Sequence, residues 1–109
     1  MRRPLRFLAH KLDLDEKQVS ELAHLLNELK TERAQAAVDH RRTVAGFADV
    51  IAGETFDEVK AGAVAAERVK SADRLREALV KALGRIHALL RVEQRAKFAY
   101  LIRTGALTL

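Results

Sequence analysis

The near absence of helix breakers is the feature that most limits how this chain can fold. Its single proline is Pro4, so nothing between residues 5 and 109 has to interrupt a helix. The chain also contains 19 alanines and 16 leucines, which are among the best helix formers. The sequence therefore predicts an all-α protein and argues against sandwiches and barrels.

Length and composition narrow the class of protein further. A chain of 109 residues can build one core, so we expect a single domain over 1–109. Cysteine is absent, which excludes disulfides, a thiol nucleophile and Cys-ligated metal sites. There is no glycine-rich phosphate loop either, and we expect no enzymatic activity. No apolar run approaches the roughly 20 residues of a membrane-spanning helix, and any signal peptide is expected to have been removed already.

Hydrophobic spacing divides the chain into four expected helices. The first is short, from about 3 to 11, with leucines along one face. Asp15 and Gln18 then form a capping box that starts a second helix of about 38 residues, ending near Gly53. A third helix is expected over 55–90 and a fourth from about 92 to 103, which Gly105 can end. The second helix carries a heptad seam, and so does the third. The seam positions are Val19, Leu22, Leu26, Leu29, Arg33, Ala36, His40, Thr43, Phe47 and Val50, then Ala65, Arg68, Ala72, Leu75, Leu79, Ala82, Ile86 and Leu89.

The segment after the second helix predicts a tight reversal at 53–55. Gly53 suits the left-handed position after a helix, and Thr55 with Glu58 resembles a second capping box. Helices 15–52 and 55–90 are then expected to pack as a long antiparallel hairpin, with Phe47 and Phe56 in the core or seam. Polar Arg33 and His40 interrupt the seam, where such groups can set register.

The expected helix lengths also bear on assembly. Helices of about 50 to 57 Å are much longer than a compact globule of this size, whose radius of gyration is about 13 Å. A lone hairpin would leave apolar surface exposed on both sides. We therefore expect an elongated homodimer with two-fold symmetry.

The net charge of +5 is concentrated at the two ends of the chain. Residues 1–11 contain four basic residues and no acid, and residues 85–109 contain five basic residues against Glu93. Such basic ends could attract phosphates or acidic polypeptides. No nucleic-acid recognition motif accompanies them, so we expect no nucleic-acid partner.

Three segments resemble the Spy/CpxP superfamily. Leu14-x-x-x-Gln18 and Leu90-x-x-Glu93-Gln94 lie where that family has paired LTxxQ motifs, with Asp15 and Arg91 in place of the threonines. Between them, the segment 51–60 resembles the one that opens the long third helix of the family.

The resemblance implies a small periplasmic helical protein that forms a cradle-shaped, intertwined dimer. It further implies an ATP-independent chaperone that binds unfolded or partly folded polypeptides in envelope stress, with a stress-signalling protein as a further partner. The alternative is periplasmic binding or sensing of a heavy metal (Zn, Ni or Co), as in the ZraP/CnrX branch. The chaperone function needs no cofactor, and the alternative function needs a divalent transition metal.

Candidate site residues follow from the same resemblance. The metal alternative would use His24 and Glu28, the one local ligand pair at i and i+4, completed by another helix or by the dimer mate. Arg91, Arg95 and Lys97 would frame the client surface with positive charge. Its apolar positions would be Leu12, Leu22, Leu26, Leu29, Phe47, Ile51, Leu79, Leu83 and Phe98.

Overall fold

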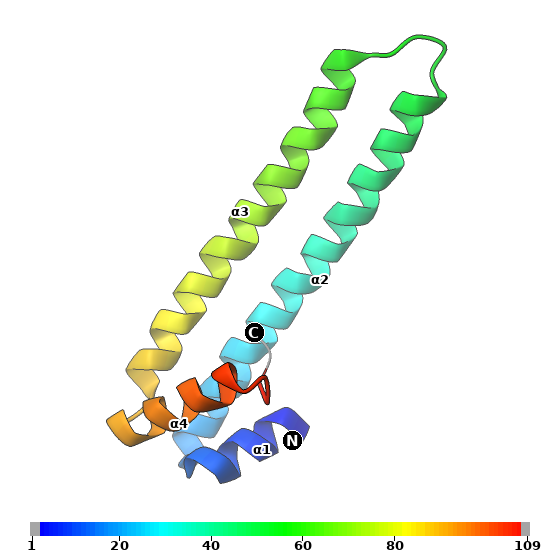
Figure 1. Ribbon diagram of the computed structural model, residues 1–109. Coiled ribbons are helices and arrows are strands. Elements are labelled where there is room, and N and C mark those ends of the chain that lie inside the picture. The colour runs from blue at the N-terminus through cyan, green and yellow to red at the C-terminus, as the bar shows by residue number, and fades with distance from the viewer. Residues whose placement is uncertain (1–2, 108–109) are drawn as a thin grey trace. The chain divides into compact units, whose positions relative to one another are not determined.

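The computed structural model describes residues 3–107, which form four helices and no strand (Figure 1). These are α1 (Arg3–Leu12), α2 (Glu16–Ala52), α3 (Glu58–Leu89) and α4 (Val92–Arg103). The all-α prediction is confirmed, and the predicted helix ends agree to within one or two residues except at the start of α3. By their packing the described residues divide into two compact units, which we call the four-helix unit (3–28 with 81–107) and the hairpin unit (29–80).

The four-helix unit contains the leucine-rich core. The apolar face of α1 packs there beside α4, the first turns of α2 and the last turns of α3. Because each fully buried large apolar side chain contributes about 1.5 to 3 kcal/mol, this cluster is the main hydrophobic source of stability in the unit. Its buried members are Leu5, Leu8, Leu12, Leu22, Leu25, Ile86, Leu90, Phe98 and Leu101.

The chain enters α2 and leaves α4 through defined turns. Asp13 has a left-handed φ of 54°, and the Leu14 N–H donates to the Ala9 carbonyl, which ends α1. After α4, Gly105 has a φ of 78°, as expected of the residue that ends this helix. Its N–H donates to the Ile102 carbonyl at 3.2 Å.

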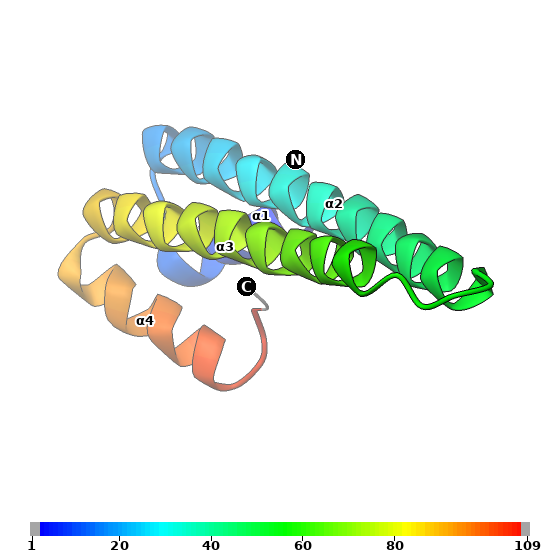
Figure 2. The same ribbon diagram turned by 90° about the horizontal axis from the view of Figure 1, so that it is seen from above.

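The hairpin unit is built differently, because only Leu29, Thr43 and Val50 are buried in it. Here α2 and α3 run antiparallel and lie side by side in both views (Figures 1 and 2). They approach closely at Gly46, where an added Cβ would lie 2.9 Å from the Val64 side chain. The predicted antiparallel hairpin is confirmed within this unit.

The predicted seam holds for α2 except at Arg33 and His40, which are exposed, and it is shifted for part of α3. On α2 the buried or half-buried positions recur every seven residues at Leu22, Leu29, Ala36, Thr43 and Val50. On α3 the expected seam residues Ala65, Arg68 and Ala72 are exposed, and half-buried positions fall instead on Ala61, Val64 and Ser71. From Leu75 to Leu89 the expected seam positions are buried or half-buried. The register differs because Val64 fits against Gly46 and Ser71 bonds to Asp39, contacts that heptad spacing does not reveal.

The turn between α2 and α3 corrects two predictions. Gly53 is not left-handed, since Gly105 is the one glycine with positive φ among the described residues. Thr55 is not the cap of α3 either. Asp57 is, because its Oδ1 accepts the Lys60 N–H at 3.0 Å. Aspartate is at least as good a cap as threonine, so the cap lies two residues later than expected, α3 begins at Glu58, and five residues remain for the reversal.

These contacts predict opposite results for two substitutions in one turn. Asp57→Ala should lower the free energy of unfolding by about 0.5 to 2 kcal/mol, because it leaves the Lys60 N–H without its acceptor. Thr55→Ala, the matched control, should change it by less than about 0.5 kcal/mol. Urea unfolding followed by circular dichroism measures both, and a larger loss for Thr55→Ala would contradict the assignment of the cap.

Candidate functional site

Two buried glutamines, one from each LxxxQ segment, meet inside the four-helix unit. The Gln18 Nε2 donates to Gln94 Oε1 at 2.8 Å, and the Gln94 Nε2 donates to Gln18 Oε1 at 3.2 Å. The two side-chain amides therefore form a reciprocal pair, the arrangement in which each amide satisfies a donor and an acceptor of the other. Sequence analysis recognised both motifs but did not predict this contact.

The remaining hydrogen bonds of the pair hold the backbone at two helix starts. Gln18 Oε1 accepts the Asp15 N–H at 3.1 Å, and Gln94 Oε1 accepts the Arg91 N–H at 2.9 Å. The Gln18 amide also donates to the Leu89 carbonyl, and the Gln94 amide donates to the carbonyls of Leu12 and Asp13. The pair therefore joins the turn before α2 to the turn before α4.

The two residues that replace the motif threonines act differently from each other. Asp15 takes over the capping role, since its Oδ1 accepts the Gln18 N–H at 2.8 Å and completes the predicted capping box. Arg91 instead holds Glu93, with Nε 2.6 Å from Oε1. This hydrogen bond lowers the pKa of the Glu93 carboxyl and raises the pKa of the Arg91 guanidinium.

Substituting either glutamine should lower the free energy of unfolding substantially, and the losses from the two substitutions should not be additive. Gln94→Leu strands the Gln18 amide and several backbone groups, so we expect a loss of about 2 to 4 kcal/mol in the free energy of unfolding. Gln18→Leu should behave similarly. The double variant should cost at least about 1 kcal/mol less than the two single losses added together, because two leucines leave no amide without its partner. Urea unfolding of the four proteins measures the coupling, and additive losses would contradict it.

The structure places the predicted client residues in three different environments. Four of them, Leu12, Leu22, Leu29 and Phe98, are buried side chains of the protein's own core. A client cannot reach them in this conformation, so they do not form part of a client surface. For Leu12, Leu22 and Phe98 the physical reason is that the apolar faces of the helices close on one another in the four-helix unit, which a prediction made helix by helix does not account for.

The other predicted apolar residues remain accessible in part. Leu26, Phe47 and Leu79 are half-buried. The Arg68 guanidinium lies over the Phe47 ring, 5.5 Å from its centroid, which restricts access to that face. Leu83 is borderline exposed, and Ile51 is 80% exposed.

The predicted basic residues lie at the junction of α3 and α4 and along α4. Arg91 is exposed and bonded to Glu93. Arg95 donates from Nε to the His87 carbonyl at 3.0 Å, near the end of α3 where unpaired carbonyls accumulate. Lys97 is exposed and lines a cavity with Lys11.

Some of the most exposed apolar residues were not predicted as site residues. Phe56, expected in the core or seam, is 65% exposed, and Val59 is 84% exposed. Both follow Ile51 within a nine-residue segment, 51–59, which we call the tip segment. The sequence signal that could have found them is the spacing of apolar residues around the turn, where no facing helix is available to cover them.

The two candidate metal ligands lie close together. His24 Nε2 is 3.0 Å from Glu28 Oε1, and both side chains are exposed. Glu28 Oε2 is also held by Arg85 at 3.2 Å, so a metal at this carboxylate would compete with a guanidinium. Over residues 3–107, no three His, Cys, Asp or Glu side chains are grouped so that they could hold an ion. The metal site stays a prediction that needs ligands from elsewhere.

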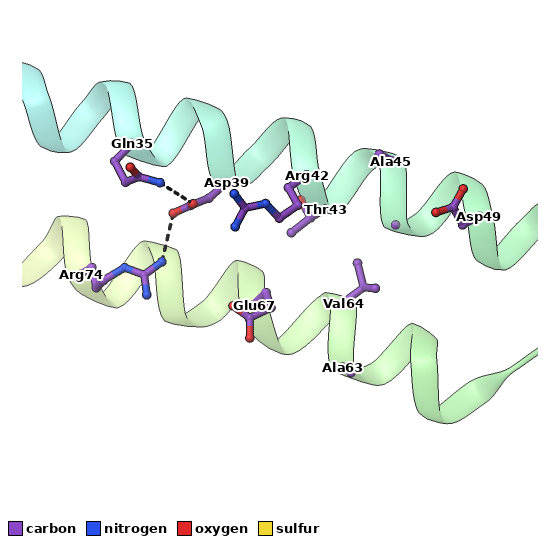
Figure 3. A pocket seen from close by; sticks show the side chains of 11 residues that line it. Gln35, Asp39, Arg42, Thr43, Ala45, Asp49, Ala63, Val64, Glu67 and Arg74 are labelled. Atoms are coloured by element: carbon purple, nitrogen blue, oxygen red, sulfur yellow. Dashed lines mark hydrogen bonds and ion pairs between the residues drawn. The ribbon is translucent and has the colours of Figure 1, made fainter.

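A carboxylate joins the two helices of the hairpin unit. Asp39 on α2 accepts from Gln35 at 3.0 Å, and its other oxygen accepts from Arg74 at 3.0 Å (Figure 3). That second oxygen also accepts from the Ser71 hydroxyl at 2.8 Å. The Gln35 amide, then the Ser71 hydroxyl and Arg74, stabilise the charged form and lower the pKa of Asp39. The same side chain borders an open cavity of about 830 Å³ between α2 and α3.

The lowered pKa makes part of the stability pH-dependent. When folding lowers the pKa of a carboxyl group, the charged group stabilises the folded protein at every pH above its ordinary pKa, which is 3.8 for Asp39. This stabilisation is lost as the pH falls through the lower pKa of the folded state. Asp39→Asn should therefore be destabilising near pH 7, and the difference from the wild type should shrink below about pH 4. Urea unfolding across this pH range measures it, and Ser71→Ala should show the same trend. A difference that stays constant with pH would contradict the assignment.

This chain is therefore a small helical protein in which two helices, α2 and α4, each begin with an LxxxQ-type motif and the two motif glutamines pair. The LTXXQ motif family matches residues 1–101, and the chain belongs to this family, which is the Spy/CpxP-type family. The resemblance seen in the sequence is thus confirmed. No curated protein and no solved structure matched the chain. Within residues 3–107, no helix combines the length and the apolar character needed to cross a membrane.

Proposed function

We propose that this protein is an ATP-independent, periplasmic chaperone-like protein that binds non-native polypeptides in envelope stress. Its family consists of non-enzymatic proteins of chaperone-like and sensor-like character, which supports this class of function and compartment. An envelope stress-signalling protein would be a further partner. The observation that carries the proposal is the exposed apolar tip segment.

The tip segment has the chemistry of a shallow client site. Ile51, Phe56 and Val59 each expose more than half of their surface within nine residues. Exposed apolar clusters of this kind mark interaction surfaces in water-soluble proteins. Non-native polypeptides expose similar apolar groups, so contact at the tip removes both surfaces from water without a nucleotide cycle.

The basic residues at the start of α4 and along it contribute attraction rather than contact area. Arg91, Arg95 and Lys97 carry positive charge, and like-charged groups gathered on one surface raise the association rate of oppositely charged chains. Acidic, partly unfolded polypeptides are therefore the preferred clients. This attraction weakens with salt, because the Debye length falls to about 3 Å at 1 M.

A homodimer fits the composition of the hairpin unit. Its helices bury only three residues against each other, although Val44, Val69 and Val80 are exposed on them. A second copy would cover such apolar side chains, and a two-fold interface is the commonest solution. The elongated, cradle-like intertwined dimer stays part of the proposal.

The client site is tested by substituting the tip. The triple variant Ile51→Ser, Phe56→Ser, Val59→Ser should require about tenfold more protein to halve aggregation of a heat-unfolded enzyme, since each lost contact contributes up to about 1 kcal/mol. Light scattering measures this without metal or nucleotide. The control replaces Val92, Tyr100 and Ile102 by serine, three exposed apolar residues of α4 that lie outside both the tip segment and the proposed dimer interface.

Two outcomes would contradict the site. Full activity of a folded tip variant would place the clients elsewhere, and equal losses in both triple variants would show a general effect of lost apolar surface. Sedimentation velocity and circular dichroism on the same samples check assembly and folding. We expect twice the chain mass of 12.2 kDa, and a monomer would contradict the dimer.

Metal binding or sensing is the second candidate, and the contact between His24 and Glu28 favours it. Calorimetric titration with Zn, Ni and Co separates the two functions. A tight stoichiometric site that His24→Ala removes would favour the metal function. Aggregation suppression that is unchanged by a chelator would favour the chaperone function.

A further inference from the structure

The positive charge of the protein is concentrated on two short helices that pack together. α1 and α4 together carry six Lys and Arg residues and one acid, Glu93. The net charge of the two helices is therefore +5, which equals the net charge of the whole chain. The two helices are in contact within the four-helix unit. Glu93 is bonded to Arg91, so its charge is already matched.

A cavity between these helices brings two lysines together. It has a volume of about 500 Å³ and is lined by Lys11 from α1 and by Ala96, Lys97, Tyr100 and Leu101 from α4. The lining contains two ammonium groups, one phenol and an apolar remainder, with no carboxylate. Neither lysine belongs to an ion pair among the described residues. The cavity therefore favours an anionic group attached to an apolar body.

Exposed aromatic side chains accompany the lysines. Tyr100 is 63% exposed at the cavity, and Phe7 is exposed one turn before Lys11 on α1. The Lys11 Nζ lies 6.0 Å from the centre of the Phe7 ring. Aromatic rings together with lysines are typical of protein surfaces that lie at the headgroup level of a bilayer.

We propose that the surface formed by α1 and α4 docks on a bilayer that contains anionic phospholipid. A lipid phosphate occupies the cavity between Lys11 and Lys97, and the rings of Phe7 and Tyr100 lie among the headgroups. The apolar face of α1 is committed to the core, so the helix does not insert. Docking is therefore peripheral, reversible and sensitive to salt.

The shape of the site favours a lipid headgroup over a polymer. Proteins that bind single-stranded nucleic acid use a continuous basic groove with successive stacking platforms. Here the two lysines converge on one cavity of limited size, which fits a single phosphate and the glycerol beside it. The surrounding basic residues then meet neighbouring headgroups through long-range attraction.

Vesicle sedimentation tests the proposal on the intact chain. The protein should sediment with vesicles containing about a third phosphatidylglycerol at about 0.1 M salt, and it should stay in solution with phosphatidylcholine alone or at about 0.5 M salt. Lys11→Gln with Lys97→Gln should weaken partitioning about 30-fold, roughly fivefold for each lysine. Tyr100→Ser should also weaken it, without any change of charge.

The matched control is Lys30→Gln with Lys60→Gln, two exposed lysines outside this surface that change the net charge equally. It should weaken partitioning much less. Circular dichroism establishes that each variant is folded, and Lys97→Gln alone provides a milder variant. Equal losses in the two double variants would overturn the proposal, because they would show a dependence on net charge only.

Other ligands are tested in the same way. Failure to bind the phosphatidylglycerol vesicles would overturn the proposal. It would also be overturned if the protein bound inorganic phosphate, polyglutamate or a single-stranded oligonucleotide in place of the vesicles, with the same dependence on Lys11 and Lys97. The vesicles contain no client, so this result is independent of the proposed chaperone function.

Discussion

A reciprocal amide pair holds together the ends of helices that are distant in the sequence. Gln18 and Gln94 are 76 residues apart, yet each satisfies the other inside the core, and both bond to backbone at a turn. Buried amides without partners would be strongly destabilising, so the surrounding leucine core is compatible with only a narrow range of helix positions. All the buried side-chain polar atoms among the described residues have partners, in keeping with this constraint.

The hairpin unit relies on different interactions. The sequence from residue 30 to 74 contains no leucine, and α2 and α3 meet there through small side chains, a close approach at Gly46 and the bonds of Asp39. Small side chains bury little area, so this unit gains less hydrophobic stabilisation than the leucine cluster does. It therefore leaves apolar side chains free for contacts with other molecules, and the proposed client site and dimer interface both lie in this unit.

Two surfaces with different chemistry result from this division. The tip segment presents apolar side chains, and the surface of α1 and α4 presents lysines with aromatic rings around a cavity. Ile51, Phe56, Val59 and Tyr100 are exposed and are not members of the buried core. The first supports binding of non-native polypeptides, and the second supports docking on anionic lipid.

The sequence by itself determined the helices, because helix formation depends on local spacing, capping groups and the absence of proline. It therefore predicted α1, the Asp15–Gln18 capping box, most of the seam of α2 and the end of α4 at Gly105. Only the tertiary structure decided which apolar faces are covered. Leu22 and Phe98 became core because other helices close over them, and Phe56 became exposed because none does. The cap at Asp57, the register of α3 and the pairing of Gln18 with Gln94 were also decided there, since each depends on how distant or competing groups meet.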